Sequence, residues 1–283
     1  WGSWVVVSYL VAMAAIQPLG GSLGDRFGRP RMMRLGLVGF TLSTVLAAFA
    51  PDIGVLVVAR TLQAVTGASA IPNGTALVRA WLPASRQGRA LGAIGAGVGL
   101  AAALGPPLGG VVTELLGWRW IFAANLIVLV PGLLWTWRLP AAERSDDAGR
   151  FDVLGAVLVL ITLVGAALAG TIWRVPGVPG LVAPAAAAIA AAAAWALRRH
   201  LARTPTPVLD ASLFGRPGFL AAGIAVLLTN LTMYTVFLAV PIFLAQHAGW
   251  GAGSVGLALA GMSVLMMIFG PIGGAWSDRV GRR

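Results

Sequence analysis

An arginine inside a long apolar run is the residue of this chain that could do the most specific chemistry. Arg60 lies in the run 53–80, roughly 12 Å along a helix that rises 1.5 Å per residue. A guanidinium placed centrally in a membrane costs at least about 2.5–3.5 kcal/mol, so other groups must compensate it. Gln63 and Gly67 follow on the same helical face. The spacing predicts a polar stripe around a buried charge. The alternative is that Arg60 is a structural anchor whose side chain extends to the outer headgroups.

Other polar side chains also lie inside apolar runs. Asn230 and Tyr234 are four residues apart near the middle of one run, where a tyrosine is outside the interfacial belt that aromatic residues prefer. Gln17, Asn73 and Asn125 are similar intramembrane positions. We expect each of these residues either to line a cavity or to bridge helices through a hydrogen bond of about 0.6 kcal/mol.

The same inventory argues against an enzyme and against a metal centre. The sequence has no cysteine, and its two histidines, His200 and His247, fall near predicted loops. The apolar runs contain no histidine, no paired carboxylates and no nucleophile with an adjacent base. We therefore expect neither a catalytic residue nor a metal ligand set.

The elements that must position these residues are apolar helices. Of the 283 residues, 58% are hydrophobic and 10% are charged, against about 25% charged in an average soluble domain. Each crossing of a bilayer needs about 20 apolar helical residues. The sequence therefore predicts an all-α polytopic membrane protein surrounded by the lipid bilayer. Runs bounded by Gly, Pro and charge predict helices at 3–22, 33–50, 53–80, 88–113, 119–138, 153–172, 179–199, 218–246 and 253–276.

The basic residues, all of them arginines, predict the orientation. Seventeen fall in alternate loops, whereas the opposite loops hold only Arg119 and Arg174. An excess of Arg in short loops marks the cytoplasmic side, so we expect a multi-pass protein of the plasma (inner) membrane with its Arg-rich loops in the cytoplasm. The net charge of +11 does not indicate nucleic acid as a partner, because the arginines form no long basic stripe with interleaved aromatic residues.

A twelve-residue segment occurs twice. Residues 18–29, PLGGSLGDRFGR, recur as 271–282, PIGGAWSDRVGR, and each copy closes an apolar run. Many transporters are built from two such repeats. The segment resembles the loop signature G-x-x-x-D-R-x-G-R-[KR] of the major facilitator superfamily, with Pro30 in place of the last basic residue of the first copy. The matching residues are Gly21, Asp25, Arg26, Gly28 and Arg29, and Gly274, Asp278, Arg279, Gly281, Arg282 and Arg283.

Two further segments are similar to signatures of the same superfamily. Residues 60–63, RTLQ, resemble R-x-x-Q-G, although Ala64 replaces the usual glycine. Residues 118–122, WRWIF, followed by Asn125, look like the opening of helix 6 in its drug antiporter branch.

The segment 105–110, GPPLGG, resembles the antiporter signature G-P-x-x-G-G, although Ala101 stands where an earlier glycine is common. Proline in mid-helix removes a donor and predicts a kink, and glycines permit close helix contact. The resemblance implies a role in sealing an exporter against leak, and small-residue packing is the alternative. The matching residues are Gly105, Pro106, Gly109 and Gly110.

The distance between the two repeats indicates the branch. In the common twelve-helix layout the copies end helices 2 and 8, whereas eight predicted helices here follow the first copy before the second closes. Two extra helices resemble the fourteen-helix drug:proton antiporter branch, and the chain then runs from helix 2 to the loop after helix 10 of a longer protein. The predicted domains are an N-terminal bundle at 1–138, two additional helices at 139–216 and the start of a C-terminal bundle at 217–283. Two pseudo-symmetric bundles are the implied fold.

The resemblance implies a function for these residues. It is proton-coupled efflux of drugs or other hydrophobic or cationic organic compounds by alternating access, with Arg60 and Gln63 in proton coupling. Asp25 and Asp278 would latch the two halves, and the alternative for both is a solvated charge at a helix end. Asp52, Glu114 and Asp152 stand only at the ends of runs, so the coupling carboxylate is expected from helix 1.

Two other functions stay open at this point. The first is a major facilitator importer or exporter of a sugar or small metabolite, and the second is a membrane sensor or scaffold that transports nothing. For the efflux transporter we expect a small organic substrate, protons as the coupling ion, a proton gradient in place of any cofactor, and activity as a monomer.

Overall fold

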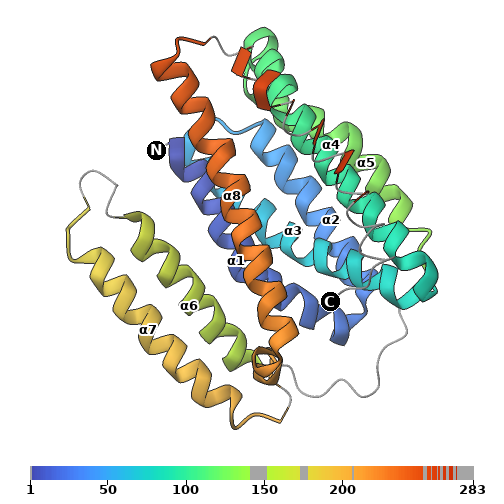
Figure 1. Cartoon of the computed structure of the whole chain (residues 1–283), viewed down its shortest axis with the longest axis vertical. Coiled ribbons are helices and arrows are strands. Elements are labelled where there is room, and N and C mark those ends of the chain that lie inside the picture. Colours follow the sequence, from blue (N-terminus) through green and yellow to red (C-terminus); the bar gives the residue numbers. More distant parts are fainter. Residues whose placement is uncertain are drawn as a thin grey trace. The chain divides into compact units, whose positions relative to one another are not determined.

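The computed structural model describes residues 2–140, 152–172, 178–205 and 207–250, and single positions between 254 and 272. The regular structure in these ranges is helical (Figure 1). The long helices bear out the all-α membrane fold. They are α1 (Gly2–Phe27), α2 (Arg29–Ala48), α3 (Ile53–Trp81), α4 (Ala84–Leu116), α5 (Arg119–Thr136), α6 (Val153–Thr171), α7 (Val182–Leu201) and α8 (Pro217–His247), with a short 3-10 helix at Ala211–Gly215 before α8.

Most predicted helices correspond to observed ones, and the ends differ where the repeat stands. The first run was expected to end at residue 22, but α1 continues to Phe27, and α2 begins at Arg29 rather than at 33. The physical reason is that the backbone leaves the helical conformation only at Gly28 of this segment, whose φ of 91° favours glycine. The predicted helix 253–276 lies largely outside the described residues.

Four helices in the described ranges combine the length and the apolar composition of a membrane span. They have 18 to 29 residues, and a bilayer crossing needs about 20. The other long helices, of 20 to 33 residues, reach the same length. The four are α2, α3, α5 and α6.

The chain divides into two compact units. The first contains Trp1–Leu77 and Phe122–Ala211, and the second contains Val78–Ile121 and Ser212–Arg283. The candidate site lies wholly within the first unit. The domain boundaries predicted from the sequence stay a prediction.

Glycines bring α1, α2 and α3 into close contact. A Cβ built on Gly20 of α1 would lie 2.5 Å from the carbonyl oxygen of Ala68 in α3, and one built on Gly36 of α2 would lie 2.8 Å from that of Thr66. The backbones therefore approach each other as closely as small residues allow. This packing holds α3, which carries Arg60, against both α1 and α2.

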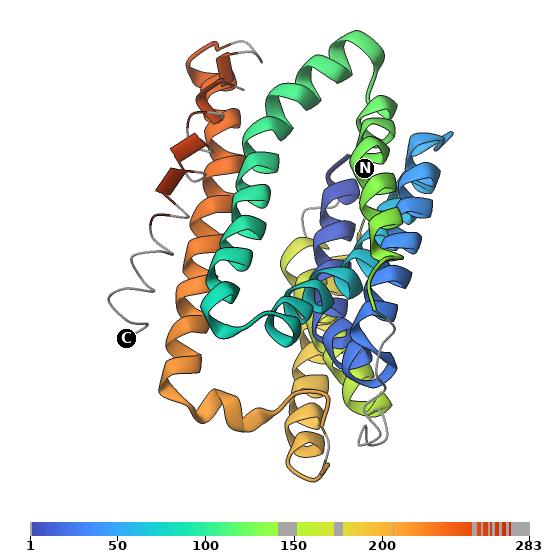
Figure 2. The same ribbon diagram turned by 90° about the vertical axis from the view of Figure 1, so that its right-hand side faces the viewer.

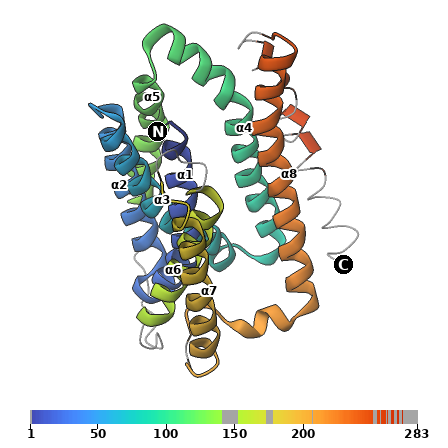
Figure 3. The ribbon, with the colours of Figure 1, turned by 90° about the vertical axis from the view of Figure 1, so that its left-hand side faces the viewer.

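Helices α6 and α7 form an antiparallel hairpin and contact each other along their length. They lie side by side in Figure 1, and α7 overlaps α6 in the view of Figure 3. The hairpin is closely packed, because a Cβ on Gly165 of α6 would lie 3.0 Å from Cβ of Ala190 in α7. Helix α6 also contacts α1. On α7, the large side chains of Ile189 and Trp195 are exposed, as lipid-facing residues are.

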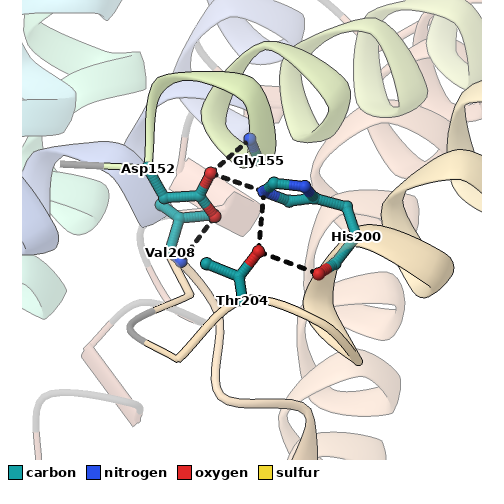
Figure 4. A network of polar contacts seen from close by, with 5 residues as sticks. All are labelled: Asp152, Gly155, His200, Thr204 and Val208. Carbon is teal, nitrogen blue, oxygen red and sulfur yellow. Dashed lines mark hydrogen bonds and ion pairs between the residues drawn. The ribbon is translucent and has the colours of Figure 1, made fainter. Parts of the chain in front are cut away.

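A buried carboxylate closes one end of this hairpin (Figure 4). Asp152, whose side chain is 4% exposed, accepts a hydrogen bond from the N–H of Gly155 at 2.7 Å and thereby caps α6. His200 Nε2 lies 2.6 Å from Asp152 Oδ1, and the N–H of Val208 donates to Oδ2 at 3.2 Å. An ionised carboxylate only accepts, so Nε2 carries the shared proton. Thr204 Oγ1 is 3.2 Å from the same nitrogen.

The cluster changes the acidity of Asp152. Burial acts to raise the pKa of this carboxyl, but the hydrogen bonds from Gly155, His200 and Val208 outweigh it and hold the pKa below its ordinary value. A carboxylate with a lowered folded pKa stabilises the fold above its unfolded pKa, about 3.9, and this contribution is lost as the pH falls through the folded value.

We expect Asp152→Asn to release the segment after α7 from the hairpin. Asparagine still caps α6 but has a single acceptor oxygen, so the amide of Val208 should exchange its hydrogen roughly tenfold faster, as for the loss of about one hydrogen bond. The acid-dependent loss of protection below about pH 4 should also disappear. Amide hydrogen exchange measures both effects. Asp52→Asn is the matched control, because Asp52 caps α3 through one exposed hydrogen bond. If the amide of Val208 exchanges as slowly in Asp152→Asn as in the parent, the role assigned to Asp152 is wrong.

In the second unit, α4 bends in its second half (Figure 2), the half that contains Gly105 and Pro106. The bend agrees with the kink expected from a proline inside a helix. A Cβ built on Gly105, Gly109 or Gly110 would meet no other atom within 4 Å.

Candidate functional site

Arg60 lies on α3 and contacts side chains from its own helix and from two other helices, α1 and α5. Its Nη1 donates to Gln63 Oε1 at 2.9 Å. Its guanidinium carbon lies 4.1 Å from the ring centroid of Tyr9 in α1 and 5.9 Å from that of Phe122 in α5. A cation over an aromatic face gains about 2 kcal/mol or more when it is desolvated. The charge in this span is therefore held by one amide and two aromatic rings.

Gln63 links this arginine to α2. The Gln63 side chain is 1% exposed, and Thr44 of α2 is fully buried. Gln63 Nε2 donates to Thr44 Oγ1 at 2.7 Å, and that hydroxyl donates in turn to the carbonyl oxygen of Phe40 at 2.7 Å. Each hydrogen bond in the series from Arg60 through Gln63 and Thr44 to Phe40 thus joins a donor to an acceptor. Gly67, on the same stripe, leaves room for the Phe40 ring, which would lie 3.0 Å from a Cβ at that position.

The first copy of the repeat forms a tight break between α1 and α2. Asp25 and Arg29 form an ion pair at 2.9 Å across Gly28, and Arg29 Nη1 also donates to the carbonyl oxygen of Ala76 near the end of α3 at 3.3 Å. Asp25 is exposed, so the pair itself contributes only about 0–1 kcal/mol. The motif therefore ties three helix ends together at one point.

Asn73 bridges helices in the structure. It is 1% exposed and donates to the carbonyl oxygens of Gly20 at 2.8 Å and of Ser69 at 2.7 Å. Gly24 provides its space, because a Cβ there would overlap the Asn73 amide. Of the two roles expected from the sequence, the geometry fits the bridge, and it places Asn73 directly beside the repeat motif.

The other predicted positions are not brought to this cluster. Gln17, Asn125 and Asn230 are exposed, and the Asn230 amide donates to the carbonyl of Val226 within its own helix. A Cβ on Gly21 would meet no other atom within 4 Å. The side chains of Tyr234 and Pro106, and the second copy of the repeat with Gly274, Asp278, Arg279, Gly281 and Arg282, lie outside what the structure describes.

Sequence reasoning missed three residues of the site: Tyr9, Thr44 and Phe122. Thr44 could have been suspected, since it is a hydroxyl in an apolar run, but such residues commonly bond only to their own helix. Phe122 belongs to the segment WRWIF, but this pattern predicts no contact for its phenyl ring. Tyr9 carried no signal of its own, because its partner is 51 positions away in the sequence.

Long apolar helices, a charge held inside one of them and a repeated motif at helix ends define a multi-pass membrane protein of the transporter class. Residues 2–283 match the family model of the Major Facilitator Superfamily. The chain belongs to this superfamily, whose members move solutes across membranes.

Individual relatives agree with that membership. The chain is 31% identical over 265 residues to the uncharacterized MFS-type transporter YvkA of Bacillus subtilis. This alignment covers 93% of the chain and 59% of the relative. It is 38% identical over 156 residues to the puromycin resistance protein pur8 of Streptomyces alboniger, and this alignment covers 55% of the chain and 31% of the relative. It is 26% identical over 287 residues to multidrug resistance protein 3 of Bacillus subtilis, and this alignment covers 99% of the chain and 55% of the relative. The chain therefore spans from about a third to somewhat over half of the length of these relatives.

Proposed function

We propose that this protein exports drugs or other hydrophobic or cationic organic compounds in exchange for protons, by alternating access. The observation that supports this function best is the environment of Arg60 inside a membrane span. A charge inside a membrane span is costly and is typical of a functional site. Here one amide and two aromatic rings from three helices contact the guanidinium, and a hydroxyl from a fourth helix binds that amide. Relatives named for multidrug and puromycin resistance support the substrate class.

Alternating access also requires two helical bundles that move against each other. Asp25 and Arg29 join α1, α2 and α3 at one point, which supports a latch that the first copy of the repeat forms at the cytoplasmic mouth, with Asp278 as its counterpart. Helices α6 and α7, packed as a hairpin of their own, would be the two extra helices of the fourteen-helix layout.

Flux through vesicles tests the function. The purified protein, reconstituted with ethidium or puromycin on one side, is expected to move the compound against its gradient when a pH gradient is imposed. The movement should stop when a protonophore dissipates that gradient. Binding without movement would indicate the sensor, and movement of sugars or metabolites alone would indicate the other class of transporter.

Single cysteines test the orientation, because the sequence has none. Ser85 is exposed in the first turn of α4, and Gly180 is exposed just before α7. The arginine distribution assigns these two helix ends to opposite sides of the membrane. We expect Ser85→Cys to react with an impermeant maleimide only from the cytoplasm and Gly180→Cys only from outside. Reaction of Gly180→Cys from the cytoplasm would contradict two crossings by α6 and α7.

A further inference from the structure

The buried face between α2 and α3 contains an interhelical pair of polar side chains. Gly36, Ser43, Thr44 and Ala47 are buried on α2. A Cβ built on Gly36 would lie 3.1 Å from Cβ of Ala70, which is buried on α3. Within this contact Gln63 meets Thr44 at 2.7 Å. An amide buried to 1% exposure needs its partners, because leaving one of its groups unsatisfied has a substantial cost.

The direction of the hydrogen bonds fixes how the Gln63 amide is turned. The Thr44 hydroxyl gives its hydrogen to the carbonyl of Phe40, so its oxygen can only accept from Gln63. The amide must then present its NH₂ to α2 and its carbonyl oxygen to Arg60. That oxygen is the acceptor that Arg60 Nη1 uses, and the opposite orientation would place two donors against each other.

We propose that Thr44 is a positioning residue for Arg60. It acts through Gln63, by fixing the orientation of the amide, and so it holds the guanidinium over the Tyr9 ring in one geometry. This role rests on the proposed function of Arg60 in transport, but the positioning itself is a property of the fold and can be measured separately. The Thr44 hydroxyl binds the Gln63 amide and the Phe40 carbonyl, so its effect on Arg60 passes through that amide.

Two variants separate the hydroxyl of Thr44 from its methyl group. Thr44→Val keeps the β-branched shape and removes the acceptor, whereas Thr44→Ser keeps the acceptor and removes a methyl group. Thr41→Val is the matched control, because Thr41 is a threonine of the same helix whose hydroxyl donates to the carbonyl of Leu37 at 2.8 Å. Any general effect of losing a threonine hydroxyl from α2 will therefore appear in both valine variants.

The first readout is the guanidinium itself, observed by NMR in nanodiscs with ¹⁵N-labelled arginine and assigned by the signal that Arg60→Lys removes. In the parent, Thr41→Val and Thr44→Ser we expect slow rotation about the Cζ–Nε bond and separate Nη signals. In Thr44→Val the Nη signals should merge because the amide no longer holds one orientation. Separate Nη signals in Thr44→Val would overturn the proposal whatever the transport result.

The second readout is transport of ethidium or puromycin in vesicles. We expect Thr44→Val to lower kcat about tenfold with KM changed less than twofold, and to shift the pH profile of transport, since a small misplacement of an active group has large effects. Thr44→Ser should recover most of kcat. If Arg60→Ala transports normally, the proposed function fails while the NMR result still decides the positioning. If Arg60→Ala is inactive and Thr44→Val equals the parent in kcat and pH profile, the positioning role is wrong and the proposed function stands.

Discussion

Replacement of Arg60 with alanine or glutamine is expected to abolish proton-driven transport while the folded protein stays in the membrane. The loss follows because Arg60 supplies the charge at the centre of the cluster with Tyr9, Phe122 and Gln63. The fold should persist, since neither replacement introduces a charge into the span and both are good helix formers. Efflux from vesicles, together with the yield of monodisperse protein in detergent, measures the two parts of this expectation.

Arg60→Lys is the informative control for the same site. Lysine keeps the positive charge but has no planar fork, and it cannot stack on a ring as guanidinium does. We therefore expect only poor recovery of transport. Normal efflux by Arg60→Ala would mean that the residue is an anchor at the outer headgroups, the alternative that the sequence left open.

Gly20→Ala is expected to remove most of the folded protein. The added Cβ would lie 2.5 Å from the carbonyl oxygen of Ala68 and 2.8 Å from Cα of Ser69, so α1 and α3 must separate. Overpacking of a tight core costs about 1–3 kcal/mol, and here the opposing atoms are backbone and cannot rotate away. The separation would also stretch the bond from Asn73 to the Gly20 carbonyl. The measurement is the thermal unfolding midpoint in detergent, with the yield from membranes.

The neighbouring glycine provides the matched control. A Cβ on Gly21 would meet no other atom within 4 Å, and alanine is the better helix former by about 1 kcal/mol. Gly21→Ala should therefore unfold at or slightly above the temperature of the parent. Equal loss of folded protein in both variants would show that the α1–α3 contact is not the cause, and that the motif has another role in folding or insertion.

Local patterns in the sequence were sufficient for the helices and for the class of protein. Apolar runs of about 20 residues predict spans because unpaired backbone groups are excluded from lipid. Seven of the eight described long helices both begin and end within about four residues of the prediction, and α1 is the exception because it continues past its predicted end. The repeated motif and the RTLQ segment led to the superfamily that the family model confirms. Arg60 and Gln63 were found as a pair because they are three residues apart on one helix.

Only the tertiary structure decided which residues from other helices complete the site. Thr44 meets Gln63 across 19 positions, and Asn73 meets Gly20 across 53. His200 meets Asp152 across 48 positions, whereas the sequence predicts only that His200 lies near a loop. The side chains that meet between two helices depend on their crossing angle and axial register, which are set by the packing of small residues such as Gly20 and Gly36. A period of 3.6 residues defines the face that a helix buries, but it carries no information about the residue that will lie opposite.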